Sequence, residues 1–235
     1  MILCIDTATP VCSVALVHDG KILSVRNSQE EKAHASNLGV FIRQVLDETK
    51  TTVNHLDAVA VSKGPGSYTG LRIGVSMAKG LCYGAGLPLI ALGTLQIMSS
   101  GMKQKALAWL NSGKITGEVL LCPVIDARRM EIYVAVFNFN NIKVQETAAI
   151  IIREDSFDHL LNRSQVIFAG SGAMKCKTMI KHKNAIFMED YVHSAIYMAE
   201  MAGVAFHNNG FENTAYFEPY YLKDFIATIP KKKVL

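Results

Sequence analysis

The sequence contains one short pattern twice, 120 positions apart. Ile5-Asp6 closes an apolar run in the first half, and Ile125-Asp126 closes one in the second. The same ungapped shift aligns Val14-Ala15 with Val134-Ala135. In both copies a predicted strand ends in an aspartate, a turn follows and a second strand leaves. Chance or shared β-propensity could produce four identities, but their place at the start of each half favours a duplicated fold.

Hydrophobic periodicity and turn residues predict the elements of each half. In the first half these are strands at 2–5, 12–17 and 21–28, a helix at 38–46, a strand at 56–61, a helix at 70–84, an apolar segment at 88–92 and a further helix. In the second half they are strands at 120–125 and 132–138, a helix at 155–161, a strand at 166–169, a helix after 170–172 and a last helix at 194–206. Residues 111–117 are typical of a linker. We therefore predict two mixed α/β halves, 1–110 and 118–235.

The composition excludes several classes of protein. Half of the 235 residues are hydrophobic and the net charge is only +4, which does not by itself indicate nucleic-acid binding. We interpret the basic run at 231–233 as a solvated tail. The longest apolar region, 71–92, carries Arg72 and Lys79 and is broken by Pro88, so no membrane span is expected. Five widely spaced cysteines and the lack of a signal peptide predict free thiols and a cytoplasmic location.

The motif K-G-P-G-S-Y-T-G-L-R at 63–72 is the strongest local signal. It lies between a predicted strand and a predicted helix, where glycines permit close approach and free N–H groups attract anions. Leu71 stands where a Walker A loop needs lysine, and the residues around Ser67 do not match a hydrolase elbow. Two interpretations stay open: an anion-binding loop that includes Ser67, or a tight connection with Thr69 as helix N-cap.

A carboxylate followed by hydroxyl residues closes the first predicted strand. Asp6 and Thr7, with Asp126 at the repeat, suit contact with a nucleotide phosphate and its magnesium ion, but such residues also form turns with their own backbone. None of the seven histidines lies three or four residues from another, so no helix carries a pair of histidine ligands. We therefore predict no metal site, and no set of catalytic residues is legible.

Taken together, these motifs resemble the TsaB family. The resemblance is carried by I-D-T-A-T at 5–9, C-S-V-A-L at 12–16, K-G-P-G-S-Y-T-G-L-R-I-G at 63–74, A-K-G-L at 78–81, I-D-A-R-R-M-E-I-Y at 125–133 and E-P-Y-Y-L-K at 218–223. It is dense through about residue 92, clear again near Asp126 and weak from 139 to 216. It implies an actin-like, HSP70-like ATPase (ASKHA) fold of two duplicated halves, in agreement with the internal repeat.

The resemblance also implies a function. It points to a non-catalytic scaffold or activating subunit in the formation of threonylcarbamoyladenosine next to the tRNA anticodon. The chain would form a heterodimer with the transferase TsaD, and a homodimer with a second copy of itself when TsaD is absent. TsaE would be a further partner, and tRNA would be bound through the complex. TsaD carries H-x-x-x-H, a pair of metal-binding histidines, where this chain has Thr94 and Met98. Neither threonine nor methionine suits a site for hard or borderline metal ions. The chain is expected to be inactive alone and to have no cofactor of its own, with ATP at the complex left open.

The helix predicted at 70–84 has two apolar stripes. One can cover its own sheet, and the other contains Ile73, Met77 and Leu81 beside small residues. Either the helix at 38–46 covers the second stripe, or a partner does, since the resemblance implies that these two helices build a four-helix contact with TsaD. The predicted partner surface consists of Leu38, Phe41, Ile42, Val45, Ile73, Met77 and Leu81.

Two further functions come from other classes. The first is a small ATP-dependent kinase or ATPase of the actin-like superfamily, which would use Asp6 and Asp126 and a purine-binding turn at 170–172. The second is a glycopeptidase, a label once attached to this superfamily, but the missing histidine pair argues against it. Nucleotide titration of the isolated protein separates the first alternative from a binding subunit.

Overall fold

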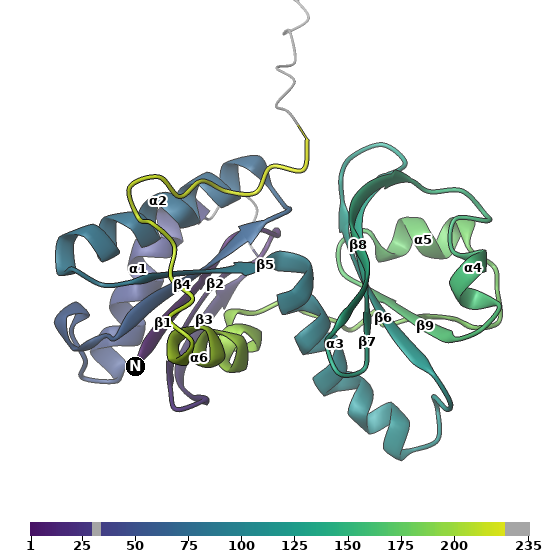
Figure 1. Cartoon of the computed structure of the whole chain (residues 1–235), viewed down its shortest axis with the longest axis horizontal. Helices are drawn as coiled ribbons and strands as arrows, with labels where there is room; N and C mark the ends of the chain where they lie inside the picture. Colours follow the sequence, from purple (N-terminus) through teal and green to yellow (C-terminus); the bar gives the residue numbers. More distant parts are fainter. Residues whose placement is uncertain (30–33, 224–235) are drawn as a thin grey trace, which may run out of the picture.

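The computed structural model describes residues 1–29 and 34–223, which form two five-stranded sheets (Figure 1). The first sheet contains β1 (Ile2–Asp6), β2 (Cys12–His18), β3 (Lys21–Ser28), β4 (Ala58–Gly64) and β5 (Leu89–Gly93). The second sheet contains β6 (Val119–Asp126), β7 (Glu131–Asn138), β8 (Lys143–Ile151), β9 (Gln165–Ala169) and β10 (Ala185–Phe187). The basic run interpreted as a tail, 231–233, lies outside the described residues.

Both sheets are built in the same way. β1 pairs antiparallel with β2 and parallel with β4, just as β6 pairs antiparallel with β7 and parallel with β9. The strand order β3-β2-β1-β4-β5 is thus repeated as β8-β7-β6-β9-β10. Asp6 ends β1 and Asp126 ends β6, so the two carboxylates occupy equivalent strand ends. The chain has the predicted actin-like fold of two duplicated α/β halves.

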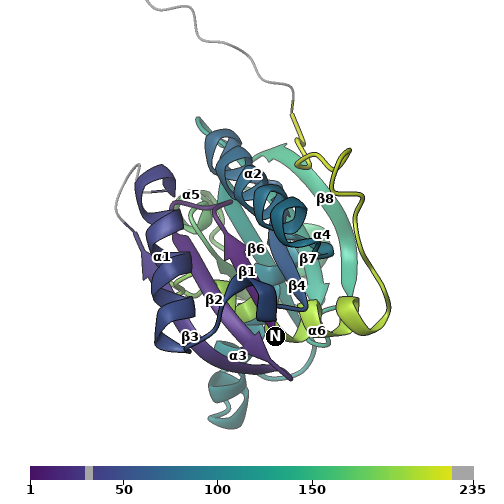
Figure 2. The same ribbon diagram turned by 90° about the vertical axis from the view of Figure 1, so that its left-hand side faces the viewer.

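Helices cover both faces of the first sheet. α1 (His34–Glu48) and α2 (Tyr68–Ala85) pack on the face that carries Leu3 and Ile5 of β1. The opposite face, with Ile2 and Cys4, packs against three later helices: α3 (Thr94–Asn111), the 3-10 helix η2 (Ala195–Met198) and α6 (Ala199–His207). Because both of its faces are covered, every residue of β1 is buried. Figure 2 shows α1 and α2 lying side by side on the first sheet.

The helix α3 connects the two halves. Ile97 joins the core of the first sheet, whereas Leu95, Met98 and Met102 join the core beneath the second sheet. The other face of the second sheet is covered by α4 (Asp158–Leu161) and α5 (Ala173–Met179). The short 3-10 helix η1 (Val53–His55) precedes β4. α3 therefore lies between the sheets and fixes how they face one another.

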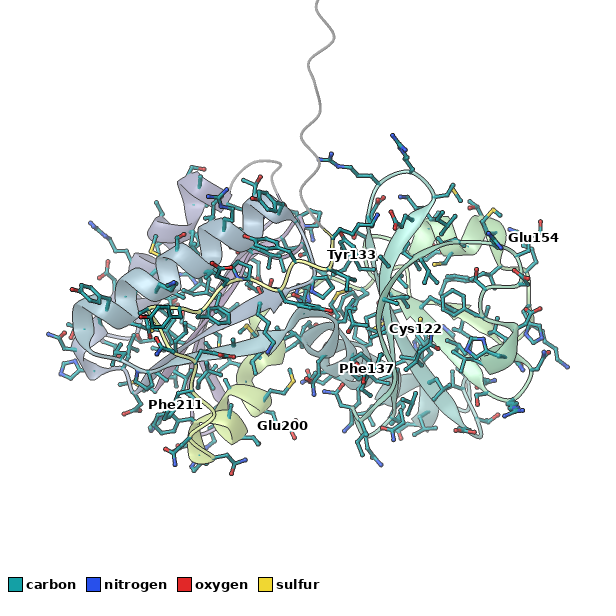
Figure 3. The ribbon with its side chains drawn as sticks, turned by 45° about the horizontal axis from the view of Figure 1, so that its top comes forward. Cys122, Tyr133, Phe137, Glu154, Glu200 and Phe211 are labelled. Carbon is teal, nitrogen blue, oxygen red and sulfur yellow. The ribbon has the colours of Figure 1, made fainter. Side chains whose placement is uncertain are left out.

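The last part of the chain returns to the first half. η2 and α6 pack on the first sheet, although both follow the second sheet in sequence. The segment 211–223, called here the strap, then runs along α2 towards the second half (Figure 1). Figure 3 places Phe211, at the start of the strap, on the first half, and Cys122 and Phe137 on the second. The predicted limits 1–110 and 118–235 therefore divide the sheets, while residues 195–217, from the second range, pack on the first half.

Most predicted elements are present, but β8 and β10 were missed. β8 is an edge strand with a mixture of half-buried and exposed residues, and β10 has only three residues, so neither has a clear period-two pattern. The five cysteines are free and buried, as predicted. Among the described residues, no helix is both long enough and apolar enough to cross a lipid bilayer.

Candidate functional site

The two sequence motifs of the first half meet at the end of β1. The amide of Ser67 donates to the carbonyl of Ala8 at 2.7 Å, and the hydroxyl of Thr7 donates to the carbonyl of Gly70 at 2.7 Å. A Cβ at Gly66 would lie 2.2 Å from the oxygen of Ala8, and one at Gly70 would lie 2.1 Å from that of Thr7. The glycines of the 63–72 motif therefore permit close approach to the chain's own β1–β2 turn.

Ser67 caps the helix that follows this loop. Its side chain accepts a hydrogen bond from the amide of Gly70 at 3.2 Å, and α2 begins at Tyr68. The expected N-cap, Thr69, is thus wrong by two residues, because the backbone turns into the helix at Ser67 (φ −59°, ψ 120°). Of the two interpretations left open by the sequence, the contacts within the chain favour the tight connection.

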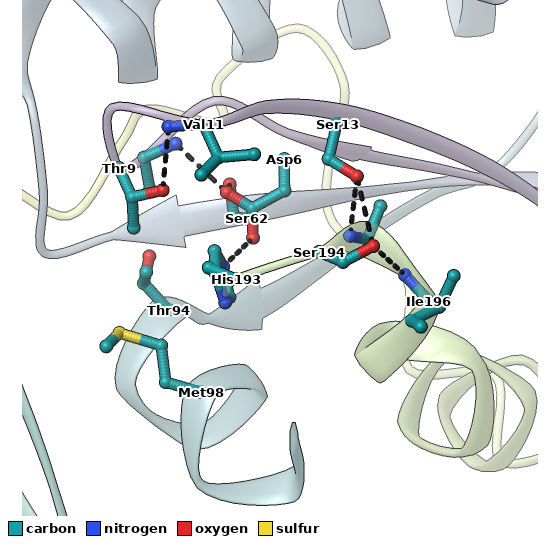
Figure 4. A network of polar contacts seen from close by, with 12 residues as sticks. Asp6, Thr9, Val11, Ser13, Ser62, Thr94, Met98, His193, Ser194 and Ile196 are labelled. Atoms are coloured by element: carbon teal, nitrogen blue, oxygen red, sulfur yellow. Dashed lines mark hydrogen bonds and ion pairs between the residues drawn. The ribbon is translucent and has the colours of Figure 1, made fainter. Parts of the chain in front are cut away.

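Asp6 lies at the centre of a buried polar network (Figure 4). Its Oδ1 accepts from the amide of Ala8 and from the hydroxyl of Ser62, both at 3.0 Å. Its Oδ2 lies 2.7 Å from Nε2 of His193, and the side chain of Asp6 is 0% exposed. Nδ1 of His193 lies 3.1 Å from the hydroxyl of Tyr191, which donates to the carbonyl of Met98. Both carboxylate oxygens are thus bonded to the chain's own groups, and the side chain is closed off from solvent.

Sequence reasoning missed His193 and Tyr191. His193 is separated from Asp6 by 187 positions and stands alone just before Ser194, which caps η2. No spacing in the sequence connects His193 with Asp6. The contact exists because the chain returns from the second half to pack η2 on the first sheet.

Thr94 and Met98, the two positions compared with histidines in the sequence resemblance, are packed inside the chain. Thr94 is fully buried, and its hydroxyl accepts the amide of Gly64 at 3.1 Å. Met98 is 1% exposed, and its methyl group lies only 2.4 Å from where a Cβ at Gly170 would be. Gly170 thus makes room for Met98 and for a close approach to Val124. Within the described residues, no three His, Cys, Asp or Glu side chains gather as a metal site would require.

The equivalent turn of the second half is open. Asp126 accepts from the amide of Arg128 at 2.7 Å and from Lys175 at 2.6 Å, and its side chain is 41% exposed. Ser171, in the turn considered for purine binding, accepts the amide of Asp126 at 3.0 Å. In residues 1–29 and 34–223, no hydrogen bond or ion pair joins Asp126 to Asp6, Thr7 or Ser67. The structure thus brings Asp6, Thr7 and Ser67 together and leaves Asp126 apart.

A cavity of about 310 Å³ lies elsewhere between the two halves. The ends of β4 and β5 and the start of α3 form one side of it, and β7 and β8 form the other. Its polar lining includes Lys63, Gln96, Lys143 and Tyr220, but neither Asp6 nor Asp126. Lys143 is already paired with Glu146 at 2.9 Å, and Lys63 lies 4.0 Å from Glu212.

The predicted partner surface divides into two groups. Leu38, Ile42 and Val45 are buried in this chain's own core, between α1 and the first sheet, so they cannot line an external contact in this conformation. The other four are half-buried and lie at the edge of that core: Phe41, Ile73, Met77 and Leu81. A Cβ at Gly39 would lie 3.9 Å from the methyl group of Met77, so α1 covers part of the second stripe.

Part of the α1–α2 pair still faces solvent. Val40 is exposed, and no atom lies within 4 Å of a Cβ placed at Gly80 or Gly84. These glycines leave the outer side of α2 flat enough for another helix to approach closely. The surface available to a partner therefore excludes three of the seven predicted residues, and it includes Gly80 and Gly84, which were not predicted.

Comparisons with known proteins match nearly the whole chain. The family model described as TsaD, tRNA N6-adenosine threonylcarbamoyltransferase, matches residues 22–233. The tRNA threonylcarbamoyladenosine biosynthesis protein TsaB of Escherichia coli (strain K12) is 30% identical and aligns over 96% of each chain. The TsaB protein of Haemophilus influenzae is 26% identical over 95% of this chain and 93% of its own length.

Solved structures agree with these matches. A crystal structure from Pseudomonas aeruginosa, of an uncharacterized protein with similarity to the peptidase YeaZ, has a TM-score of 0.79 and 25% identity, and covers 94% of this chain and 99% of that one. A second structure, YeaZ from Pseudomonas aeruginosa, has a TM-score of 0.73 with the same identity and coverage.

Proposed function

The chain belongs to the TsaB family, and we propose that it is the non-catalytic subunit that binds and activates TsaD in the formation of tRNA threonylcarbamoyladenosine. Its similarity to TsaB proteins, over nearly the full length of both chains, supports a role in the biosynthesis of this modified nucleoside. TsaE and tRNA would be the other components, in the cytoplasm, with ATP used at the complex.

One observation carries the non-catalytic part of this proposal. Thr94 and Met98 stand where the resemblance implies a metal site in TsaD, and both are engaged within the chain: Thr94 accepts the amide of Gly64, and Met98 packs beside Gly170. Asp6 is engaged by His193 and Ser62 and is not exposed to a substrate. These contacts disfavour the alternative of a kinase or ATPase, which would need an accessible carboxylate at the end of β1.

The binding part of the proposal rests on α1 and α2. The half-buried side chains of Phe41, Ile73 and Met77 border the exposed backbone at Gly80 and Gly84. Small residues permit two helices to pack closely, and a specific interface typically buries roughly 1,600 Å² in total. We propose that TsaD packs here, and that a second copy of this chain packs here when TsaD is absent.

The function is tested by reconstitution. Purified chain is mixed with TsaD and TsaE of the same organism, ATP, threonine, bicarbonate, the enzyme that forms threonylcarbamoyl adenylate and an unmodified tRNA, and the modified nucleoside is measured by mass spectrometry. We expect modification only when both this chain and TsaD are present. Turnover of ATP by the isolated chain, or full modification without it, would instead favour the enzyme alternative or remove the proposed role.

The interface is tested by placing a charge where the fold itself has room. Gly80→Glu puts a carboxylate on the open side of α2, where it would have to be desolvated in a helix contact, at a cost of several kcal/mol. We expect loss of the TsaD complex in size exclusion with an unchanged circular dichroism spectrum. Met77→Glu should have the same effect on binding, while Gly80→Ala is the matched control that keeps the surface uncharged. Normal binding by a folded Gly80→Glu protein would place the interface elsewhere.

A further inference from the structure

A row of aromatic and cationic side chains crosses from the first half to the second along the strap. It begins on α2, where the guanidinium of Arg72 lies 5.5 Å from the ring centre of Tyr68. The rings of Tyr68 and Tyr221 are 4.9 Å apart and tilted by 37°. Lys223 of the strap then forms an ion pair with Glu131, the first residue of β7. The strap therefore joins the two halves along one surface (Figure 1).

The strap is held in place by its backbone and by Phe217, which packs against the core of the first half, while its tyrosine rings stay partly exposed. The amide of Tyr220 donates to the carbonyl of Lys63 at 2.7 Å, and Lys79 donates to the carbonyls of Ala215 and Phe217 at 3.2 and 2.9 Å. The exposed fractions of the tyrosines are substantial: 83% for Tyr216, 45% for Tyr220 and 37% for Tyr221. A fixed backbone with exposed aromatic rings presents flat surfaces at little further entropic cost.

The row ends at the β6–β7 turn, which exposes two arginines. Arg128 and Arg129 have φ angles of +71° and +49°, a region that disfavours residues with a side chain. Neither arginine takes part in an ion pair within the described parts of the chain, 1–29 and 34–223. The turn adjoins Lys223, since the amide of Glu131 donates to the carbonyl of Arg128 at 3.1 Å. The strained turn thus holds two cations that are unpaired as far as the described residues show.

The nearby acids only partly offset this positive charge. Glu131 is paired with Lys223, and Asp126 is paired with Lys175. The pKa of the Tyr221 hydroxyl is raised, first by burial and then by the neighbouring Tyr68. Arg72 lowers this pKa, and Glu218 on the strap raises it by the smallest amount. Arg72, Arg128 and Arg129 therefore remain as exposed positive charges on either side of the tyrosines.

We propose that the strap tyrosines and the Arg128–Arg129 turn form a binding surface for a single-stranded segment of RNA. Bases stack on aromatic rings and on guanidinium planes, while arginines contact phosphates, and this alternation is typical of single-strand recognition. An acidic protein surface would use the cations but would not require exposed rings, so the tyrosines favour RNA. The inference rests on the proposed function, under which tRNA is the substrate of the complex. It adds a direct contact between tRNA and this subunit.

This surface is separate from the proposed TsaD contact. Arg72 and Lys79 lie on the flank of α2 that faces the strap, whereas Met77 lies on the flank beside α1. A partner helix on the α1–α2 side would therefore leave the strap side open to RNA.

The test is retention of a labelled, unmodified tRNA transcript on filters by the full chain, measured between about 50 and 200 mM KCl. The double variant Arg128→Gln with Arg129→Gln should weaken binding and reduce the slope of log affinity against log salt by about 1.5, because two phosphate contacts are lost. Tyr221→Leu should weaken binding about tenfold without changing the slope, and Tyr221→Phe should restore it.

The matched control removes two charges from the opposite end of the second sheet. Arg163 precedes β9 and Lys183 precedes β10, whereas the Arg128–Arg129 turn follows the carboxyl end of β6, which runs parallel to β9. The double variant Arg163→Gln with Lys183→Gln should keep the wild-type affinity and slope. Equal effects of the two double variants would overturn the proposal, and so would a wild-type chain that retains no transcript. If the Arg128→Gln, Arg129→Gln variant lost TsaD binding but kept its tRNA retention, the proposal would also be overturned, and the surface would be a protein contact.

This assay reads RNA binding directly, so its outcome is independent of the reconstitution. A chain that supports modification but does not retain tRNA contradicts only the RNA surface. A chain that retains tRNA through these residues but supports no modification contradicts only the proposed function.

Discussion

The turns that follow β1 and β6 occupy the same place in a repeated sheet, yet their surroundings are opposite. The β1–β2 turn is closed from one side by the 63–72 loop and from the other by His193, and Asp6 is fully buried. The β6–β7 turn faces solvent, with Asp126 bonded to Lys175 and two arginines at positive φ. A duplicated topology thus fixes where a strand-end carboxylate lies, but the elements packed around it decide whether it can act as a site.

This difference separates the two halves by role. The first half uses its turn for internal packing, because glycines and a histidine from distant parts of the chain converge on it. The second half leaves its turn free, and the strap reaches it from the first half.

The largest expected effect comes from removing the two carboxylates separately. Asp6→Ala leaves His193, which is 4% exposed, without its partner in the core, and breaking a buried pair in this way typically costs about 3–5 kcal/mol. Asp126→Ala removes a partly exposed pair with Lys175, which is worth about 1 kcal/mol or less. Urea denaturation of both variants measures the difference in the free energy of unfolding.

Two further variants refine this experiment. Asp6→Asn keeps the shape and some of the hydrogen bonds, so its loss should be smaller than that of Asp6→Ala. His193→Ala should also destabilise strongly, and the double variant with Asp6→Ala should cost less than the sum of the two single variants, since both break the same contact. Similar losses for Asp6→Ala and Asp126→Ala would mean that the two turns are equivalent after all.

The next effect tests how closely the first turn is packed. Gly70→Ala places a Cβ 2.1 Å from the carbonyl oxygen of Thr7, which forces the loop away from β1. Such overpacking typically costs about 1–3 kcal/mol. Gly80→Ala, in the same helix but with open space around it, should stabilise by about 0.5–1 kcal/mol through helix propensity. A thermal shift assay separates the two outcomes, and equal shifts would contradict the close packing of the turn.

Much of this contrast could not be read from the sequence. The internal repeat favoured the duplicated fold, because Ile5-Asp6 and Ile125-Asp126 are local signals with fixed spacing, and the family resemblance agreed with it. The same equivalence made Asp6 and Asp126 look like one pair of phosphate ligands. Their difference depends on His193, which comes from a segment 187 positions away, and on the packing of the glycine loop against Thr7 and Ala8.

The predicted partner surface illustrates a second limit. Helical periodicity correctly indicated that Leu38, Ile42 and Val45 share one face of α1, but it cannot say whether that face meets a sheet or a partner. The structure places these three residues in the core of the first half. The role of the strap was also beyond the sequence, since its motif E-P-Y-Y-L-K has no periodic pattern.

Another effect depends on pH and on the buried carboxylate of Asp6. Burial, helped by the nearby charge of Asp6, raises the pKa of the Cys4 thiol to about 12. An unfolded cysteine ionises near about 8.5, so the unfolded state loses its proton first as pH rises. Cys4 should therefore lower the free energy of unfolding by about 1.4 kcal/mol per pH unit between about 9 and 12. Urea midpoints of the wild type and Cys4→Ala across this range measure the contribution as a difference in slope.

The second half provides the control for this measurement. The pKa of Cys122, on the central strand β6, is also raised, first by burial and then by the Cys176 thiol, with no contribution from Asp126. Asp6→Asn should therefore reduce the pH dependence that Cys4 contributes, whereas Asp126→Asn should leave that of Cys122 unchanged. An effect of Asp126→Asn on the slope would show that the second carboxylate also reaches its core.

The smallest expected effect concerns the strain in the open turn. Arg129→Gly relieves a φ of +49°, which typically costs a residue with a side chain about 1–2 kcal/mol, and part of this gain is offset by the greater freedom of glycine in the unfolded chain. The net stabilisation should be about 1 kcal/mol or less, measured by urea denaturation. Arg153→Gly, at an exposed position without a positive φ, should instead destabilise slightly.

If the strained turn serves RNA binding, Arg129→Gly should unfold at higher urea while retaining less tRNA, and Arg129→Lys should keep part of the retention because it keeps the charge. Higher stability with full tRNA retention would mean that the strain has no connection with binding, and the contrast between the two turns would then be one of packing alone.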